Sequence, residues 1–358
     1  MRRLSPHWYL PMSSGGKSVL CLENCRVLVT GGAGFIGSGV VWGLNRLGCE
    51  NIVVADRLRQ SDKWKHLVPL RFRDYLEAGD LLSRLQNGAL GRFDLVLHLG
   101  ACSATTERDA SYLAKNNFEF TKDLAMWALS QDVRFVYASS AATYGDGGAG
   151  MSDKEGRLER FRPLNAYGYS KQLFDLYASR HELLDRIAGL KYFNVFGPNE
   201  DHKGDMRSVV HKAFVQVRKS GRIQLFKSHR PDYRNGEQQR DFLYVKDAVA
   251  MTLHVACRLT ANGLFNVGSG KAHTWIDLAK AVFGSLKRRV RIEYIAMPQD
   301  IRTKYQYFTQ ADISQLRATG YRAPVTTLED AVRDYIENYL IPDRLLDPDA
   351  PDHRPAGR

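Results

Sequence analysis

A glycine-rich turn between two apolar segments constrains the fold of this chain more than any other feature. The turn reads Thr30-Gly31-Gly32-Ala33-Gly34-Phe35-Ile36-Gly37. The β-branched run at 26–30 predicts a buried strand before it, and the apolar spacing over 36–47 predicts a helix after it. A second apolar run, residues 52–55, ends at Asp56. Strand, glycine turn, helix and a strand that ends in an acid are the sequence pattern of a dinucleotide-binding βαβ unit.

Three of the glycines are spaced three apart, and each suits one task. Without a Cβ atom, Gly31 allows a tight turn, Gly34 lets the backbone approach a pyrophosphate, and Gly37 permits close packing of helix on strand. The phosphates are then expected at the helix N-terminus, where free N–H groups and the helix dipole favour negative charge.

The residues at and after Asp56 bear on which dinucleotide is bound. A carboxylate at this position accepts a hydrogen bond from the adenosine ribose, which by itself indicates NAD. Arg57, Arg59 and Lys63 follow closely and could hold a 2′-phosphate instead. A solvated basic loop is the alternative explanation for those three. We expect NADP, with NAD as the alternative.

The pattern of strands and helices continues beyond the turn. Apolar runs at 95–99 and 135–138 predict strands, with a helix over 112–129 between them and a further strand at 190–194. Alternating strands and helices indicate a parallel sheet, so the fold class is α/β: a Rossmann-type doubly wound sheet with a smaller α/β lobe for the substrate. A helix is predicted over 166–184, with a buried face formed by Tyr169, Leu173, Leu176, Tyr177 and Leu184.

Shifts in composition suggest the domain boundaries. Residues 1–24 are rich in Pro, Ser and Gly and are expected to be a disordered extension, and 341–358 a mobile tail. The dinucleotide-binding domain is assigned to 25–195 together with 242–270. The substrate-binding lobe is assigned to 196–241 together with 271–340.

Tyr167 and Lys171 form the candidate catalytic pair. They are four residues apart at the start of a predicted helix and therefore share one face. A tyrosine with a pKa of about 10 is a poor base at neutral pH, but a nearby ammonium would lower that pKa. Lys171 can also bind the nicotinamide ribose, and the hydroxyl of Ser140, at the end of a predicted strand, can orient a substrate oxygen. Tyr and Lys four apart occur often by chance, so the pair gains its meaning from the glycine turn and Ser140.

Composition excludes several classes of protein. The net charge of +12 comes from 51 basic and 39 acidic residues, spread along the chain without interleaved aromatics, so we expect no nucleic-acid partner. No apolar run approaches the ~20 residues of a membrane helix, and the N-terminus lacks the apolar stretch of a signal peptide. The five cysteines are widely spaced and odd in number, which indicates neither disulfides nor a metal site but a reducing cytoplasm.

Taken with further motifs, these residues resemble the extended short-chain dehydrogenase/reductase family, which modifies nucleotide sugars. The resemblance covers about residues 26–340 and includes Arg240-Asp241-Phe242-Leu243-Tyr244-Val245 and Phe265-Asn266-Val267-Gly268-Ser269-Gly270. More specific motifs narrow it to epimerases of this family that act on an ADP-activated heptose for the lipopolysaccharide core. These motifs lie at 100–107, 139–145, 192–198, 202–204 and 308–312.

The resemblance implies that the enzyme inverts C6 of the heptose. An unactivated secondary alcohol has no acidic C–H bond, so inversion requires transient oxidation to a ketone and return of hydride to the other face. Because the sugar oxygen then points elsewhere, a second acid/base is useful, and the family motif places it at Lys203, in His202-Lys203-Gly204. Burial or a neighbouring cation should lower the pKa of Lys203 if it has this role. Without the motif, a surface lysine would be the better interpretation.

The resemblance also implies the remaining site residues. Cofactor contacts are expected, besides those above, from Phe35, Ile36, Ala101, Cys102, Ser103, Asn116 and Val195. Substrate contacts are expected from Asn194, Asp205, Lys212, Phe226, Arg240 and Tyr305, with Lys227, His229 and Arg230 as lesser candidates. Two departures put the pocket geometry in doubt: Asp205, an acid near an anionic substrate, and the long stretch 227–239.

Three alternatives stand beside this reading. A 4,6-dehydratase would carry an acid pair after Ser140, where this chain has Ala141 and Ala142. A UDP-hexose 4-epimerase shares the same residues and is disfavoured only by the motifs at 100–107 and 202–204. A non-catalytic dinucleotide-binding or RNA-associated protein would tend to lose Ser140, Tyr167 or Lys171. Relatives look oligomeric, so a homo-oligomer is expected.

Overall fold

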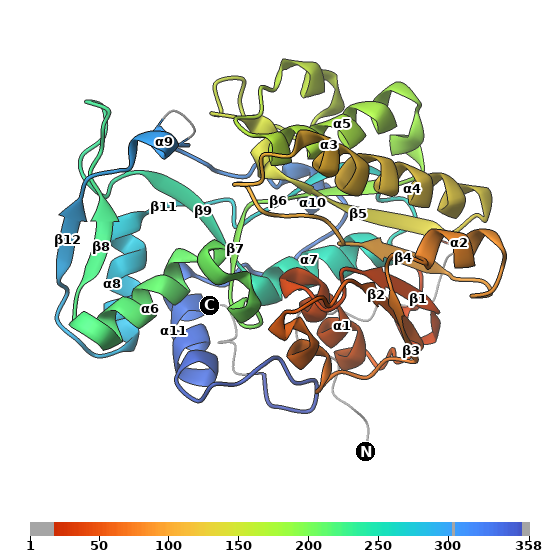
Figure 1. Ribbon diagram of the computed structural model, residues 1–358, viewed down its shortest axis with the longest axis horizontal. Coiled ribbons are helices and arrows are strands. Elements are labelled where there is room, and N and C mark those ends of the chain that lie inside the picture. The colour runs from red at the N-terminus through yellow and green to blue at the C-terminus, as the bar shows by residue number, and fades with distance from the viewer. Residues whose placement is uncertain (1–17, 303–304, 353–358) are drawn as a thin grey trace.

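The computed structural model describes residues 18–302 and 305–352 of the chain (Figure 1). At its centre is a seven-stranded parallel sheet with the order β10-β6-β5-β4-β1-β2-β3. Its strands are β1 (Val27–Thr30), β2 (Ile52–Asp56), β3 (Asp74–Glu77), β4 (Leu95–His98), β5 (Arg134–Ser140), β6 (Ala188–Tyr192) and β10 (Gly263–Val267). The strand order reverses between β1 and β4, as in dinucleotide-binding folds, and the predicted fold class is confirmed.

Helices cover both faces of this sheet (Figure 1). One face carries α1 (Phe35–Arg46) and α7 (Val245–Cys257), which pack against each other. The other carries α2 (Leu81–Gln86), α3 (Ala110–Leu113), the π-helical turn η3 (Ala114–Glu119), α4 (Phe120–Ser130) and α5 (Ala166–Arg180). Short 3-10 turns join these elements: η1 (Leu22–Asn24), η2 (Asp62–Leu67), η4 (Ala141–Tyr144), η5 (Glu155–Arg160) and η6 (Leu183–Asp185).

The alternation of strand side chains explains the two layers. Val27 and Val29 of β1 enter the core beneath α1 and α7, whereas Leu28 enters the core beneath α4 and α5. All three are fully buried. Strands that are covered on both faces need apolar side chains at every position, which is why they read as continuous apolar runs.

A smaller lobe adjoins the carboxyl edge of the sheet. It holds a three-stranded sheet of β7 (Asn194–Phe196), β9 (Gln239–Tyr244) and β11 (Ala272–Thr274), and a parallel pair of β8 (Ile223–Phe226) and β12 (Ile292–Ile295). Its helical elements are η7 (Asp201–Met206), α6 (Val209–Ser220), α8 (Trp275–Ser285), α9 (Gln299–Arg302), α11 (Leu328–Tyr335) and η8 (Ile336–Leu340). A third apolar core joins α6, α8 and α11.

The helix that carries Tyr167 and Lys171 differs from its predicted form. It ends at Arg180 rather than Leu184, and Tyr169 is 52% exposed. The predicted apolar face was therefore wrong at Tyr169, whereas Leu176 and Tyr177 pack partly buried against the apolar core. The buried side of α5 combines Phe174 of that core with Lys171 and Asp175, which face polar groups on β5.

Both ends of the described chain are packed rather than loose. Leu22 is buried and the Leu20 N–H donates to the Cys257 carbonyl, so the part of the expected extension from residue 18 onward is ordered. Residues 1–17 and 353–358 lie outside the described residues. The expected mobile tail is also wrong for 341–352, because Leu346 is buried in the core beneath α1 and the Asp352 carboxylate pairs with Lys246 at 2.9 Å.

The lobe boundaries also differ in one place. The segment around α10 (Ser314–Ala318) was expected in the substrate lobe, but Leu316 and Tyr321 are buried in the core of the large sheet. The return of residues 245–267 to that sheet, through α7 and β10, follows the expected division. The division as a whole stays a prediction.

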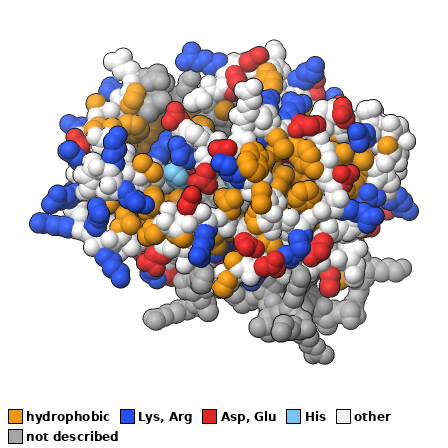
Figure 2. Space-filling model, turned by 60° about the horizontal axis from the view of Figure 1, so that its bottom comes forward, with side chains coloured by type: hydrophobic (Ala, Val, Ile, Leu, Met, Phe, Trp, Pro, Cys, Tyr) orange, Lys and Arg blue, Asp and Glu red, His pale blue; other side chains and the backbone are white. Residues whose placement is uncertain are grey.

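Two surface properties bear on possible partners. None of the described helices is long and apolar enough to cross a membrane. On the face shown in Figure 2, Lys and Arg side chains are scattered among acidic ones and do not form a continuous stripe. Dispersed charge of this kind is typical of a solvated surface.

Candidate active site

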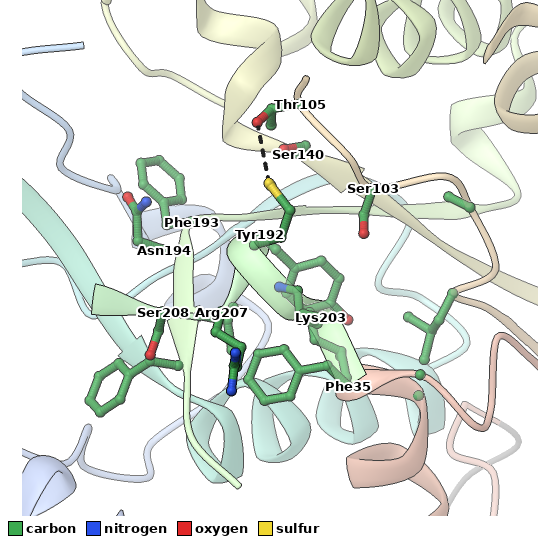
Figure 3. A pocket seen from close by; sticks show the side chains of 18 of the residues that line it. Phe35, Ser103, Thr105, Ser140, Tyr192, Phe193, Asn194, Lys203, Arg207 and Ser208 are labelled. Atoms are coloured by element: carbon green, nitrogen blue, oxygen red, sulfur yellow. Dashed lines mark hydrogen bonds between the residues drawn. The ribbon is translucent and has the colours of Figure 1, made fainter. Parts of the chain in front are cut away.

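A central cavity of about 490 Å³ opens where several strands of the large sheet end. Gly31 follows β1, Gly100 follows β4, Ser140 ends β5 and Tyr192 ends β6, and all four line it. Ligands of open α/β sheets bind at the carboxyl ends of the strands, where the strand order reverses. Lys203, Arg207 and Ser208 close the opposite wall from the smaller lobe (Figure 3).

The glycine turn forms the floor of this cavity, and its geometry requires glycine. Gly31 has φ +70°, and a Cβ atom there would lie 2.6 Å from the Gly100 nitrogen. A Cβ on Gly37 would lie 2.0 Å from the Gly31 carbonyl oxygen, so the helix could not approach the turn. Phe35, Ile36 and Gly37 bring the first turn of α1 to the cavity wall. The N-terminus of α1 therefore presents its positive end to the cavity.

Asp56 lies at the end of β2 and anchors the neighbouring loop. Its carboxylate accepts hydrogen bonds from the Ala33 N–H at 2.8 Å and from the Lys63 ammonium at 2.6 Å. The central cavity and a side cavity of about 280 Å³ are both lined by Asp56, Lys63 and Ala101. The two cavities thus share one wall at the carboxyl end of β2.

The other residues expected around the adenosine also line the side cavity. Arg57 donates to the Asn116 side chain at 3.3 Å, and Arg59 lies 3.5 Å from the Tyr112 hydroxyl. Cys102 lies on the same wall. The side cavity is therefore lined by three cationic side chains from a single stretch of sequence: Arg57, Arg59 and Lys63.

Ser140 and Tyr167 meet at the centre of the site. The Tyr167 side chain hydrogen bonds to Ser140, and both residues line the central cavity. Helix α5 begins just before Tyr167, where the Asn165 side chain accepts from the Gly168 N–H and caps the helix. Burial raises the pKa of Tyr167, the Ser140 hydrogen bond lowers it, and the Cys102 thiol raises it. Burial, rather than the expected ammonium, is the dominant influence on this tyrosine.

Lys171 lies one turn further along α5, with only 5% of its surface exposed. Its ammonium donates to the Ala138 carbonyl of β5 at 2.8 Å. Burial lowers the pKa of Lys171 to about 8, and the Asp175 carboxylate partly opposes that shift. The three expected catalytic residues of the dinucleotide domain are thus brought together by α5 and β5.

Lys203 enters the central cavity from η7. Its ammonium lies 5.1 Å from the centre of the Phe35 ring, and Figure 3 shows the two side chains against each other. Burial lowers the pKa of Lys203, in the expected direction, and Glu200 opposes the shift. A loop lysine therefore shares a cavity with Tyr167.

Arg240 and Tyr305 lie together behind one wall of the central cavity. The Arg240 guanidinium lies 5.0 Å from the Tyr305 ring and 5.7 Å from the ring of Trp275, which lines the cavity. It donates to the Gln239 carbonyl at 2.8 Å and to the Gln306 carbonyl. Arg240 is 5% exposed, so its charge is held by backbone oxygens and aromatic faces.

The remaining expected site residues divide into two groups. Ser103, Asn194 and Val195 line the central cavity. Asp205 and Lys212 are exposed and Phe226 is half-buried, and none of these three lines the central cavity in the described part of the chain. Their expected contact with the substrate stays a prediction.

Several cavity residues were not found from the sequence. Thr105, whose hydroxyl lies 3.9 Å from the Met206 sulfur, Arg207, Ser208 and Trp275 all line the central cavity. They come from loops and helix starts far apart in the chain. Thr105 belongs to the motif at 100–107 but was not singled out as a site residue, and no periodicity or motif marks the other three, because only the packing of the two lobes brings them together.

His66 and His202 connect the two walls. Their rings pack edge to face at 4.9 Å, and the His66 Nδ1 is 2.8 Å from the Ala33 carbonyl of the glycine turn. Burial lowers the pKa of His66 and lowers that of His202 to about 4. The two rings are therefore neutral and join η2 to the turn that carries Lys203.

The structure fits a dinucleotide. The glycine turn has no room for a Cβ atom and, with the free N-terminus of α1, provides a phosphate cradle. Asp56, at the end of β2, provides a partner for the ribose. The buried His202 Nδ1 has no hydrogen-bond partner among the described residues, and His202 lines both the central and the side cavity. Among the described residues, no group of three or more His, Cys, Asp or Glu side chains is arranged to hold a metal ion.

Comparisons with known proteins agree with this site. The NAD dependent epimerase/dehydratase family matches residues 27–268. An ADP-L-glycero-D-manno-heptose-6-epimerase from Nitratidesulfovibrio vulgaris (strain DP4) is 52% identical over 314 residues, which cover 87% of this chain and 97% of that protein. The protein of the same name from Fusobacterium nucleatum subsp. nucleatum is 41% identical over 326 residues, covering 88% and 98%.

Solved structures extend the comparison. Helicobacter pylori ADP-L-glycero-D-manno-heptose-6-epimerase matches with a TM-score of 0.75 and 28% identity, covering 89% of this chain and 97% of that one. A UDP-N-acetylglucosamine 4-epimerase from Methanobrevibacter ruminantium M1 matches with the same TM-score and 25% identity, covering 89% and 99%. The predicted resemblance is confirmed, and the chain belongs to the NAD dependent epimerase/dehydratase family, whose members use a nicotinamide dinucleotide.

Proposed function

We propose that this protein inverts C6 of ADP-D-glycero-D-manno-heptose to give ADP-L-glycero-D-manno-heptose, for the lipopolysaccharide core. The observation that carries the proposal is the placement of two possible proton-transfer groups in one cavity beside the glycine turn. Tyr167 enters from α5 and Lys203 from η7. Relatives that carry this activity in their names match this chain over nearly their whole length, which supports the substrate class.

The presence of two possible acid/base groups in one cavity is better explained by an inversion than by a simple oxidation. A bound nicotinamide would accept hydride from C6 and return it to the opposite face of the ketone. The sugar oxygen lies in different places before and after the ketone turns, so one side chain cannot serve both positions. Tyr167 serves one position, where Ser140 orients the oxygen, and Lys203 serves the other.

The protonation of these two groups supports complementary roles. Burial keeps the Tyr167 hydroxyl protonated at neutral pH, ready to donate to a ketone oxygen. The lowered pKa of Lys203 increases the fraction of neutral amine, which can accept the hydroxyl proton. Lys171, held at the Ala138 carbonyl, supplies positive charge near the tyrosine and can bind the nicotinamide ribose.

We further propose that the dinucleotide is NADP rather than NAD. Gly31, Gly34 and the first turn of α1 would hold the pyrophosphate, and Asp56 the ribose. The side cavity next to Asp56 is lined by Arg57, Arg59 and Lys63, which could neutralise a 2′-phosphate. Comparing the Kd of the purified protein for NADP and NAD by calorimetry tests this choice. Equal or tighter binding of NAD would overturn it.

The substrate would lie between the lobes. Arg240 and Tyr305, behind the Trp275 wall, support binding of the ADP group, and Asn194 supports binding of the sugar. Asp205, Lys212 and Phe226 are retained as outer contacts of the same substrate. We also propose a homo-oligomer in the cytoplasm, which is consistent with five free cysteines.

The decisive experiment offers two substrates in parallel. Purified protein with NADP is incubated with ADP-D-glycero-D-manno-heptose and, separately, with UDP-glucose, and the products are identified by NMR. We expect inversion at C6 of the heptose and no UDP-galactose. Conversion of UDP-glucose alone would replace the proposal with a UDP-hexose 4-epimerase, and turnover of neither would favour a non-catalytic dinucleotide-binding protein.

A further inference from the structure

A buried ion pair lies directly beneath the catalytic residues, and the mechanism above does not use it. The Lys191 ammonium is 2.5 Å from the Asp175 carboxylate, and both side chains are completely buried. A buried charge pair is costly to desolvate and is only weak evidence for stability. Its position beneath Ser140 and Lys171 points instead to a role in the site.

The pair joins α5 to β6, the strand that lies beside the one carrying Ser140. Asp175 lies four residues after Lys171 and eight after Tyr167, so all three lie along one side of α5. Lys191 lies on β6 opposite Ser139 of β5, one residue before Ser140. The ion pair thus connects the helix of Tyr167 to the neighbour of the strand that ends in Ser140.

Hydrogen bonds extend the connection on the strand side. The Asp175 carboxylate accepts from the Ser139 hydroxyl at 2.7 Å and from the Tyr137 hydroxyl at 2.9 Å. Lys191 donates to the Thr143 hydroxyl at 2.8 Å. Thr143 in turn donates to the Ser140 carbonyl at 2.8 Å. These bonds all lead to residues 137–143, the segment that contains Ser140.

We propose that Asp175 and Lys191 are positioning residues that hold α5 against the end of β5, so that Tyr167 and Lys171 meet Ser140 in the reactive geometry. The inference rests on the proposed function, since it assigns a role within the same reaction. Neither residue lines the central cavity, so neither is a catalytic residue. Asp175 also carries negative charge close to the Lys171 ammonium and favours its protonated form.

A second buried pair in the same chain provides a matched control. Lys246 of α7 lies 2.7 Å from Asp334 of α11, with side chains 0% and 2% exposed. The Tyr244 hydroxyl also donates to Asp334. This pair joins α7 to the smaller lobe and makes no hydrogen bond to Ser140, Tyr167 or Lys171 among the described residues. It reports the effect of disturbing a buried charge without disturbing the catalytic geometry.

The test compares Asp175→Asn with Asp334→Asn. We expect both to lower the Tm, because each removes a carboxylate from a buried lysine; the loss should be smaller for Asp334→Asn, since Lys246 keeps the Asp352 carboxylate at 2.9 Å. Only Asp175→Asn should lower kcat, by roughly 10- to 100-fold, the effect of misplacing a reacting group, while KM changes little. Tm losses with kcat unchanged in both variants would overturn the proposal.

A pH profile separates positioning from general destabilisation. Removing the Asp175 charge should lower the pKa of Lys171 further below about 8 and move the alkaline limb of kcat to lower pH. The Cys102 thiol also raises the pKa of Lys171, and Lys171 lowers the pKa of His98. The packed elements also carry Tyr167, Lys191 and Tyr192, and Tyr137, whose hydroxyl donates to Asp175. Because none of these groups is altered, an unshifted limb would contradict the role assigned to Asp175.

A gentler pair of variants keeps the test decisive if Asp175→Asn does not fold. Thr143→Val removes the hydroxyl between Lys191 and the Ser140 carbonyl but keeps the shape, whereas Thr143→Ser keeps the hydroxyl. We expect Thr143→Val to lower kcat several-fold and Thr143→Ser to retain it. Equal kcat values would overturn the proposal. All ratios are measured on whichever nucleotide sugar the wild type converts, so a wrong substrate assignment overturns only the proposed function.

Discussion

The two walls of the central cavity are built in different ways. The dinucleotide wall consists of strand ends in one sheet: Gly31 after β1, Asp56 at the end of β2 and Ser140 at the end of β5. The substrate wall consists of short segments from the smaller lobe, including η7 with Lys203 and the start of α8 with Trp275. A sheet fixes its strand ends relative to one another, whereas short segments depend on packing between lobes. We therefore expect a substitution on the dinucleotide wall to change either cofactor affinity or the rate of the chemical step. A substitution on the substrate wall should change the rate of inversion.

The largest effect is expected from Tyr167→Phe, where the two walls meet. Loss of a proton-transfer group should reduce turnover by roughly 10²- to 10⁴-fold while NADP stays bound. Turnover is measured by product NMR and cofactor retention by absorbance after gel filtration. Tyr169→Phe is the control, because Tyr169 lies on the same helix and is exposed. A Tyr167→Phe enzyme with near-normal turnover would remove the tyrosine from the mechanism.

Lys203→Met tests the substrate wall. We expect epimerisation to fall about 10²-fold, because the second orientation of the sugar loses its proton-transfer group. Because Lys203 accepts the hydroxyl proton during oxidation, hydride transfer to NADP should fall as well, and the absorbance of the reduced cofactor at 340 nm follows it. Lys219→Met changes an exposed lysine of α6 and should leave the rate unaltered. If the Lys203 variant inverts the heptose at the wild-type rate, another group accepts this proton.

Gly37→Ala tests the dinucleotide wall. A Cβ at 2.0 Å from the Gly31 carbonyl forces the turn to shift, and such overpacking costs roughly 1–3 kcal/mol of unfolding free energy. Affinity for the cofactor should fall with it. Gly284→Ala in α8 meets nothing within 4 Å and should not destabilise the fold. Comparison of the two variants by urea unfolding and cofactor titration checks both expectations; equal stability would show that the turn tolerates a side chain.

Lys63→Met should have the smallest effect. Losing one charged hydrogen bond should weaken NADP binding by about 10-fold, with NAD binding changed much less. Titration calorimetry with each cofactor gives the ratio, and Lys65→Met, at an exposed neighbour, is the control. A uniform loss for both cofactors would mean that Lys63 mainly orders Asp56 through their 2.6 Å ion pair.

The sequence predicted the positions of residues in the fold best where the relevant contacts are local. Gly31, Gly37 and Asp56 follow from spacing within one βαβ unit, and Tyr167 and Lys171 from the spacing of one helix turn. The predicted apolar face of α5 was wrong at Tyr169 and missed Lys171 and Asp175, because part of the buried side packs on the hydroxyls of β5 instead of on the apolar core. The expected tail was also wrong, since the burial of Leu346 depends on a site some 300 residues earlier in α1.

By itself, the sequence determined the class of fold and the placement of the glycine turn and of the candidate pair Tyr167 and Lys171 on their elements, because strand and helix periodicity fix which neighbouring side chains share a face. Only the tertiary structure decided which residues distant in the sequence lie beside the glycine turn and the candidate catalytic pair. Thr105, Arg207 and Trp275 complete the central cavity, Asp175 meets Lys191 beneath it, and Tyr167 is governed by burial rather than by its lysine. The physical reason is that burial and desolvation depend on the whole surrounding packing, which no local spacing encodes.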